Sequence, residues 1–134
     1  MKENFVDFDG KGVYSGPEFT WIKTVGPTAI RFFNSDNFGA NYKNDMFVGN
    51  VHNQNIYHFD LDDNRTSLLL HGPLKDKIAG RPEELHDVLF AKGLGRITDL
   101  EVGPDGNLYV LSHSFNKAPY TGTGSIFKIS KSDN

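Results

Sequence analysis

Arg96, Asp99 and Glu101 are the first candidates for chemistry, because they fall within one short segment, 95–102 (GRITDLEV). Successive side chains of a β-strand point to opposite faces, so Asp99 and Glu101 are expected on the same face of a strand. Two neighbouring carboxylates can exchange protons with a substrate and so act in acid–base catalysis. Ion pairing with Arg96 or Arg31 is the simpler role for these carboxylates, and the sequence favours it.

Histidines are the second kind of candidate, and the chain has five: His52, His58, His71, His86 and His113. His52 and His58 are expected on neighbouring strands across a turn, and Asp60 shares a strand face with His58. A zinc site would need a third and a fourth ligand beyond two histidines. The sequence therefore favours a simpler interpretation, in which His58 and Asp60 form the solvent-facing side of an alternating strand.

An oxygen-rich turn follows the same strand, with Asp60, Asp62, Asp63 and Asn64 close together. Calcium prefers oxygen ligands of this kind. The turn lacks the glycine and the distal glutamate of an EF-hand loop, so a polar hairpin tip is the favoured interpretation.

Aromatic residues near the N-terminus, Tyr14, Phe19 and Trp21, could stack on a sugar ring. Aromatics at the start of a strand are more often part of a core, and the core interpretation is favoured. The sequence contains neither a glycine-rich phosphate loop nor a Gly-x-Ser-x-Gly motif.

The composition limits the classes of protein to which this chain can belong. The chain has 134 residues, a net charge of −3 and no basic run, which argues against nucleic-acid binding. Without cysteine there is neither a disulfide nor a thiolate metal site. No apolar run approaches the roughly 18 residues that span a bilayer, and residues 1–10 lack the apolar stretch of a signal peptide. Abundant aromatics and 14 glycines indicate an all-β fold with many turns.

Strand patterns predict a four-stranded antiparallel unit over residues 27–70. Its strands are expected at 28–33, 46–51, 56–61 and 66–70. An irregular connector at 71–95 follows, and Pro82 with two following glutamates predicts a short helix within 83–90.

A second unit is predicted over residues 96–130. Its strands are expected at 97–102, 107–112 and 125–130, and the first two are joined by a Gly-Pro-Asp-Gly turn at 103–106. The fourth strand of this unit could come from residues 4–8 (NFVDF). The two units are weakly similar in strand order: PTAIRF aligns with ITDLEV, DMFVG with NLYVL, and NIYHF with SIFKI. Two such antiparallel units predict a β-propeller-like fold of about two blades.

Several segments, in this order, resemble the C-terminal part of the glucose/sorbosone dehydrogenase family. They are PEFTW (17–21), PTA (27–29), DMFVGN (45–50), NIY (55–57), GRITDL (95–100), GPDG (103–106), LYVL (108–111) and GSIFKI (124–129). The family consists of six-bladed β-propellers and includes soluble sugar dehydrogenases that use pyrroloquinoline quinone (PQQ). The resemblance covers nearly the whole chain, but only about the last third of the family's propeller.

The resemblance implies PQQ and calcium as cofactors and three cofactor-binding positions. In PQQ-binding members, arginines flank the isoleucine of the Gly-Arg-Ile-X-Asp stretch and contact PQQ carboxylates; here Arg96 keeps the first and Thr98 replaces the second. A lysine facing PQQ is replaced by His52. Arginine forks suit carboxylates better than threonine or histidine does. The family's catalytic histidine lies in an earlier blade, and no segment of this chain matches it.

Two blades in a row would leave two apolar sheet faces exposed, which monomers rarely tolerate. Three alternatives remain open: a piece of a larger polypeptide, a ring in which three copies supply six blades, or a smaller sandwich whose 71–95 segment covers one face. The trimer is the favoured alternative. In such a ring, Arg96 and Thr98 would surround an axial channel that could hold a small anion.

The leading functional expectation is a propeller module that is not catalytic alone and binds a sugar, a small anion or a protein partner. The alternatives are a part of an active PQQ-dependent aldose sugar dehydrogenase and a purely structural oligomerisation unit. Neither a nucleic acid nor a membrane is expected as a partner. The resemblance implies a periplasmic or extracellular location.

Overall fold

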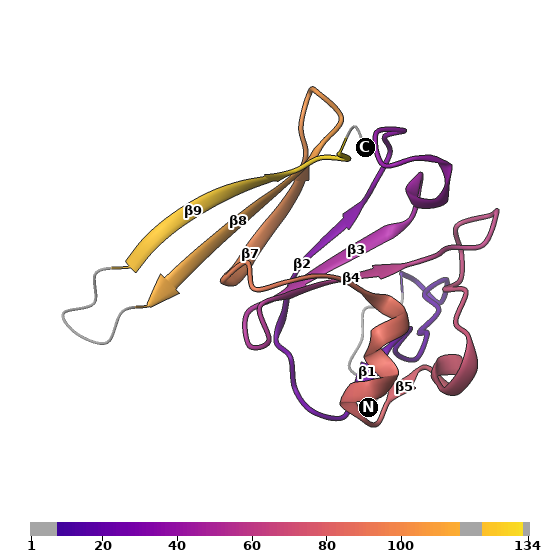
Figure 1. Cartoon of the computed structure of the whole chain (residues 1–134). Coiled ribbons are helices and arrows are strands. Elements are labelled where there is room, and N and C mark those ends of the chain that lie inside the picture. The colour runs from indigo at the N-terminus through magenta and orange to yellow at the C-terminus, as the bar shows by residue number, and fades with distance from the viewer. Residues whose placement is uncertain (1–7, 116–121, 133–134) are drawn as a thin grey trace.

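The computed structural model describes residues 8–115 and 122–132, and over these residues the regular structure is almost entirely β (Figure 1). The strands are β1 (Thr20–Trp21), β2 (Pro27–Phe32), β3 (Met46–Asn50), β4 (Asn55–Phe59), β5 (Ile78–Ala79), β6 (Leu89–Lys92), β7 (Arg96–Val102), β8 (Leu108–Phe115) and β9 (Gly122–Ile129). Short 3₁₀ helices are η2 (Ala40–Tyr42), η3 (Gly72–Asp76) and η4 (Pro82–Val88). The all-β prediction is confirmed. Within the described residues, no helix has the length and apolar character needed to cross a membrane.

The strands form two antiparallel sheets that stand side by side, as partial propeller-like blades do (Figure 1). The first sheet has the order β2-β3-β4-β6, and the second has the order β7-β8-β9. The second sheet follows the chain strand by strand, whereas the first passes from β4 to β6 because β5 pairs with β1. The first strands, β2 and β7, lie next to each other. A small parallel pair, β1 with β5, lies beside the first sheet.

The fourth strand of the first sheet is where the sequence prediction is wrong. Residues 66–70 form no strand and make only one isolated bridge, Leu61 with Leu68. The Asp62 carboxylate accepts the backbone N–H groups of Thr66 (2.6 Å) and Ser67 (3.2 Å), which ties this segment into a turn. The fourth place is taken by β6, which lies within the predicted connector.

The other expected elements of the two units are present. The first three strands of the first unit match β2, β3 and β4 to within one or two residues, and the short helix is η4. The three strands of the second unit match β7, β8 and β9. Of the proposed completing strand at 4–8, residues 4–7 lie outside the described residues, and Phe8 lies in a turn with a φ of 51°.

The Gly-Pro-Asp-Gly turn joins β7 to β8 as its residue types predict. The Gly103 N–H donates to the Asn107 carbonyl (2.9 Å), and the Asn107 N–H donates to the Asp105 carboxylate (3.1 Å). Gly106 has a φ of 75°, a backbone conformation that favours glycine. Turn chemistry therefore fixes the register of this hairpin.

The main core lies between the two sheets. Phe33, Phe47 and Ile56 from the first sheet region pack with Ile97, Leu100, Leu108 and Val110 from the second, and all are fully buried. Gly49 lies where the two sheets approach closely, and an added Cβ there would lie 2.4 Å from Ile97 Cγ2. Beside it, the Thr28 hydroxyl donates to the Ile97 carbonyl across the sheets (2.5 Å).

A second core covers part of the opposite face of the first sheet. Val48, Tyr57 and Phe59 pack there with Leu74, Ala79 and Val88 from the 71–95 segment. Phe19 and Trp21 join this cluster through edge contacts with Phe59. The core interpretation is therefore correct for Phe19 and Trp21, whereas Tyr14 is exposed.

Within residues 8–115 and 122–132, both sheets keep an apolar face that no other segment covers. A groove of about 640 Å³ runs over β2, β3 and β1, lined among others by Ile30, Phe32 and Trp21. On the far side of the second sheet, a hollow of about 250 Å³ is lined by Leu111 and Ile126 together with Asp99, Glu101 and Tyr109. Ile30 is 61% exposed and Ile126 is 72% exposed.

Gly49→Ala tests the close approach of the sheets. The new methyl group must displace Ile97, so we expect the free energy of unfolding to fall by about 1–3 kcal/mol. Adding Ile97→Leu removes the β-branch and should recover part of the loss, as a double-mutant cycle in denaturant would measure. Gly16→Ala is the matched control, because nothing lies within 4 Å of its added Cβ. Equal stability of Gly49→Ala and Gly16→Ala would contradict this packing.

Asp105→Asn tests the turn between β7 and β8. Hydrogen bonds from Lys128 (2.8 Å), Asn107 and Tyr109 hold the pKa of the Asp105 carboxyl well below its ordinary 3.8. A lowered folded-state pKa stabilises the fold above pH 3.8, and this contribution is lost as pH falls further. We expect Asp105→Asn to lower the Tm at pH 7 and to approach the wild-type Tm below about pH 4.

The control for this pH dependence is Asp63→Asn, which changes an exposed carboxylate in another turn. It should leave the Tm at pH 7 unchanged. A Tm difference between wild type and Asp105→Asn that stays constant down to about pH 2 would contradict the proposed linkage.

Candidate functional site

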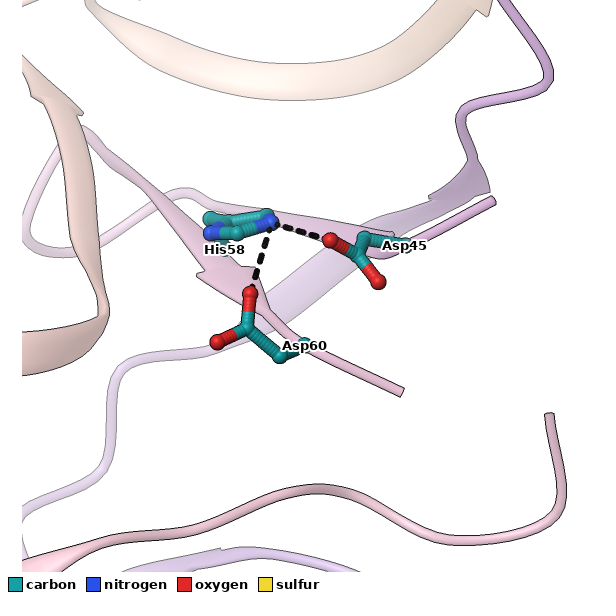
Figure 2. Close-up of side chains that lie close together, drawn as sticks. All are labelled: Asp45, His58 and Asp60. Carbon is teal, nitrogen blue, oxygen red and sulfur yellow. Dashed lines mark hydrogen bonds and ion pairs between the residues drawn. The ribbon is translucent and has the colours of Figure 1, made fainter. Parts of the chain in front are cut away.

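Asp45, His58 and Asp60 come together at the open end of the β3–β4 hairpin (Figure 2). Met46 of β3 is paired with Phe59 of β4, so Asp45, just before β3, faces Asp60, just after β4. Side chains alternate along a strand, which puts His58 on the same face as Asp60. Two antiparallel strands thus bring three polar side chains to one place.

The two carboxylates converge on a single ring nitrogen of His58. His58 Nε2 lies 3.0 Å from Asp45 Oδ2 and 3.5 Å from Asp60 Oδ1 (Figure 2). The other Asp45 oxygen, Oδ1, accepts the backbone N–H of Leu61 at 3.0 Å. The side chains of Asp45 and His58 are 12% and 16% exposed, whereas that of Asp60 is 50% exposed.

Aromatic rings hold the His58 imidazole in position. Its ring centroid lies 4.9 Å from that of Tyr42 and 5.1 Å from that of Phe47. Phe47 is the cross-strand partner of His58 and is fully buried. The imidazole is thus packed between two aromatic rings, with Nε2 directed at the two carboxylates.

The expectation of a solvent-facing His58 is wrong, for a reason that the cross-strand pairing makes clear. His58 shares its face with Phe47, which packs in the core between the sheets, so this face is not solvated. Of His58 and Asp60, only Asp60 has an exposed side chain. His52 does not join His58, because it lies in the β3–β4 turn at the other end of the hairpin.

The predicted cofactor positions lie near that other end. Arg96 begins β7, and the β3–β4 turn that carries His52 lies beside the approach to β7, where the Gly93 N–H donates to the Gln54 carbonyl (3.0 Å). The buried Asn50 side chain fixes this turn by accepting the Asn53 N–H (2.8 Å). His52 is exposed in the turn.

Thr98 occupies a bulge in β7 and uses its hydroxyl within its own sheet. The register of β7 with β8 shifts between Ile97 and Asp99, and the Thr98 hydroxyl donates to the Leu111 carbonyl (3.2 Å). Thr28 has the equivalent place in β2, where the register also shifts, but its hydroxyl donates to the Ile97 carbonyl of the other sheet (2.5 Å). A hydroxyl at a bulge thus binds a strand carbonyl in both cases, within the sheet for Thr98 and across the sheets for Thr28.

The carboxylates of β7 have structural partners. Glu101 forms an ion pair with Arg31 of β2, which links the first strands of the two sheets. Asp99 accepts the backbone N–H of Leu100 (2.9 Å). The ion-pair interpretation is confirmed for Glu101 and Arg31.

The oxygen-rich turn at 60–64 also has a structural role. Asp62 accepts the backbone N–H and the hydroxyl of Thr66, the latter at 2.9 Å, together with the Ser67 N–H. These bonds, led by the Thr66 N–H, hold the pKa of the Asp62 carboxyl below its ordinary value. Both Asp62 oxygens are thus engaged by the hairpin, as a polar turn requires.

Comparisons with known proteins give a family match and several related solved structures, two of which are described below. The family model of glucose/sorbosone dehydrogenases matches residues 3–118. A solved glucose dehydrogenase is 18% identical with a TM-score of 0.53, over 80% of this chain and 26% of the other. A Thermus thermophilus protein described as a putative oxidoreductase (glucose dehydrogenase) is 23% identical with a TM-score of 0.48, over 74% of this chain and 23% of the other.

The chain spans about a quarter of the length of these two structures. No curated protein gives a significant match. At 18% identity, the likeness to the first structure shows a shared fold.

Proposed function

We propose that this chain, which belongs to the glucose/sorbosone dehydrogenase family, is a propeller module that works only within a larger set of blades. The module binds a small polar ligand or a protein partner and does not oxidise a sugar on its own. The observation that carries this proposal is the pair of uncovered apolar faces, one on each sheet. Such faces mark surfaces that another protein segment covers.

The proposed cover is another copy of the same chain. The groove over β2 presents Ile30 and Phe32, and the far face of the second sheet presents Leu111 and Ile126. These faces lie on opposite sides of the pair of sheets, so one copy can follow another head to tail. A rotation of about 120° per copy closes such contacts into a ring of three, and three pairs of sheets give six blades.

The residues at the predicted cofactor positions do not fit PQQ. The three carboxylates of PQQ call for cationic, fork-like donors. Arg96 carries a guanidinium of this kind, whereas Thr98 has a hydroxyl, which donates to the Leu111 carbonyl, and His52 offers one imidazole from an exposed turn. A small anion needs fewer donors, and Arg96 repeated around a threefold axis could hold one.

Light scattering tests the assembly. We expect a native mass of about three times 15.0 kDa for the wild-type chain. Ile30→Lys places a charge in the groove and should shift the mass to that of the single chain. The matched control is Val13→Lys, at an exposed apolar residue outside the groove, which should keep the wild-type mass. A wild-type protein that stays at 15.0 kDa at all concentrations would contradict self-assembly.

Titration with PQQ and calcium, followed by dye-coupled sugar oxidation, tests the cofactor argument. We expect no sugar oxidation by the wild-type chain. The double variant His52→Lys with Thr98→Arg supplies two further cations and should bind PQQ at least about tenfold more tightly, since a hydrogen bond to a charged group contributes about 1.5–3 kcal/mol. Sugar oxidation by the wild-type chain with PQQ would overturn the proposal and favour a catalytic dehydrogenase part.

A further inference from the structure

The cluster of Asp45, His58 and Asp60 lies apart from the predicted cofactor positions and has no role in the proposed assembly. We propose that it is a binding site for a divalent transition-metal ion of the zinc class. Each residue offers one ligand atom, and these atoms lie within 4.8 Å of one another. The proposal stands independently of the propeller ring, because all three residues belong to one hairpin.

The spacing of the ligand atoms fits a zinc ion. Zinc binds nitrogen and carboxylate oxygen at about 2.0–2.2 Å in a tetrahedron, so neighbouring ligands are about 3.3 Å apart. His58 Nε2 is 3.0 Å from Asp45 Oδ2 and 3.5 Å from Asp60 Oδ1, which brackets this separation. Only small side-chain movements would bring the three atoms onto one ion.

The arrangement around His58 Nε2 also favours a cation. A ring nitrogen carries at most one hydrogen, yet two carboxylates face this one atom (Figure 2). A single N–H can donate a good hydrogen bond to only one of them. A divalent ion between the three groups would bind both carboxylates and the nitrogen lone pair. The ion would also reduce the repulsion between two like charges.

Two of the ligands are held in place before any ion arrives. The Leu61 N–H binds Asp45 Oδ1 and leaves Oδ2 directed at His58, and the Tyr42 and Phe47 rings enclose the imidazole. Such contacts orient metal ligands in known sites. Asp60 is half exposed, so the site opens to solvent and water can take the remaining position.

The ligand atoms of the site, one imidazole nitrogen and carboxylate oxygens, decide which metal ions it favours. One imidazole with two carboxylates suits Zn²⁺ and its first-row neighbours, whereas Ca²⁺ prefers six to eight oxygen ligands. The chain has no cysteine, so thiolate ligation does not enter. We therefore expect Zn²⁺ to bind more tightly than Ca²⁺.

Calorimetric titration of the chelator-treated full chain with Zn²⁺ alone tests the site. We expect saturable binding of one ion per chain. Asp60→Asn should weaken it at least about tenfold, because an amide replaces an anionic ligand at an exposed position that the fold tolerates. Asp63→Asn removes a carboxylate three residues away and should bind Zn²⁺ as the wild type does.

A second readout identifies the ligand nitrogen. In ¹⁵N-labelled protein, Zn²⁺ should shift the Nε2 resonance of His58 and leave those of His71 and His86 in place. A wild-type chain that binds no Zn²⁺, equal affinities for wild type and Asp60→Asn, or an unshifted His58 Nε2 would each overturn the proposal.

Discussion

The close contact between Gly49 of β3 and Ile97 of β7 is the constraint on which the arrangement of the two sheets depends. A side chain at residue 49 would occupy the space of the Ile97 methyl group. Without it, β7 comes near enough to the first sheet for the Thr28 hydroxyl to reach the Ile97 carbonyl and for Arg31 to reach Glu101. Dense packing at this contact then fixes the positions of the larger core residues around it.

This contact also explains why two sheets alone leave a surface that another segment can cover. Each sheet uses one face against the other, and the 71–95 segment covers only part of the opposite face of the first sheet. Ile30 and Ile126 stay exposed on the outer sides. The same geometry that joins two blades can be repeated, because a propeller packs every blade against the next in the same way.

Local turn chemistry made most of the strands predictable. The one wrong strand prediction, at 66–70, is explained by competition between local and distant hydrogen-bond partners. The Gly-Pro-Asp-Gly turn specifies its hairpin through residues within the turn, so the sequence alone is sufficient there. Residues 66–70 have a strand-like composition, but Asp62 binds the N–H groups of Thr66 and Ser67. β6 pairs with β4, which lies about 30 residues earlier in the chain, and no local sequence pattern predicts a pairing over that separation.

The two ends of the β3–β4 hairpin show how far a site can be predicted. At the turn, the sequence predicted the position of His52, but only the structure shows that the Thr98 hydroxyl donates to the Leu111 carbonyl at a bulge in β7. At the open end, the alternation of β4 predicted that His58 and Asp60 share a face, but Asp45 became visible only from the register of β3 with β4. The β3–β4 pairing places these two polar regions at opposite ends of one hairpin, so they share no residue.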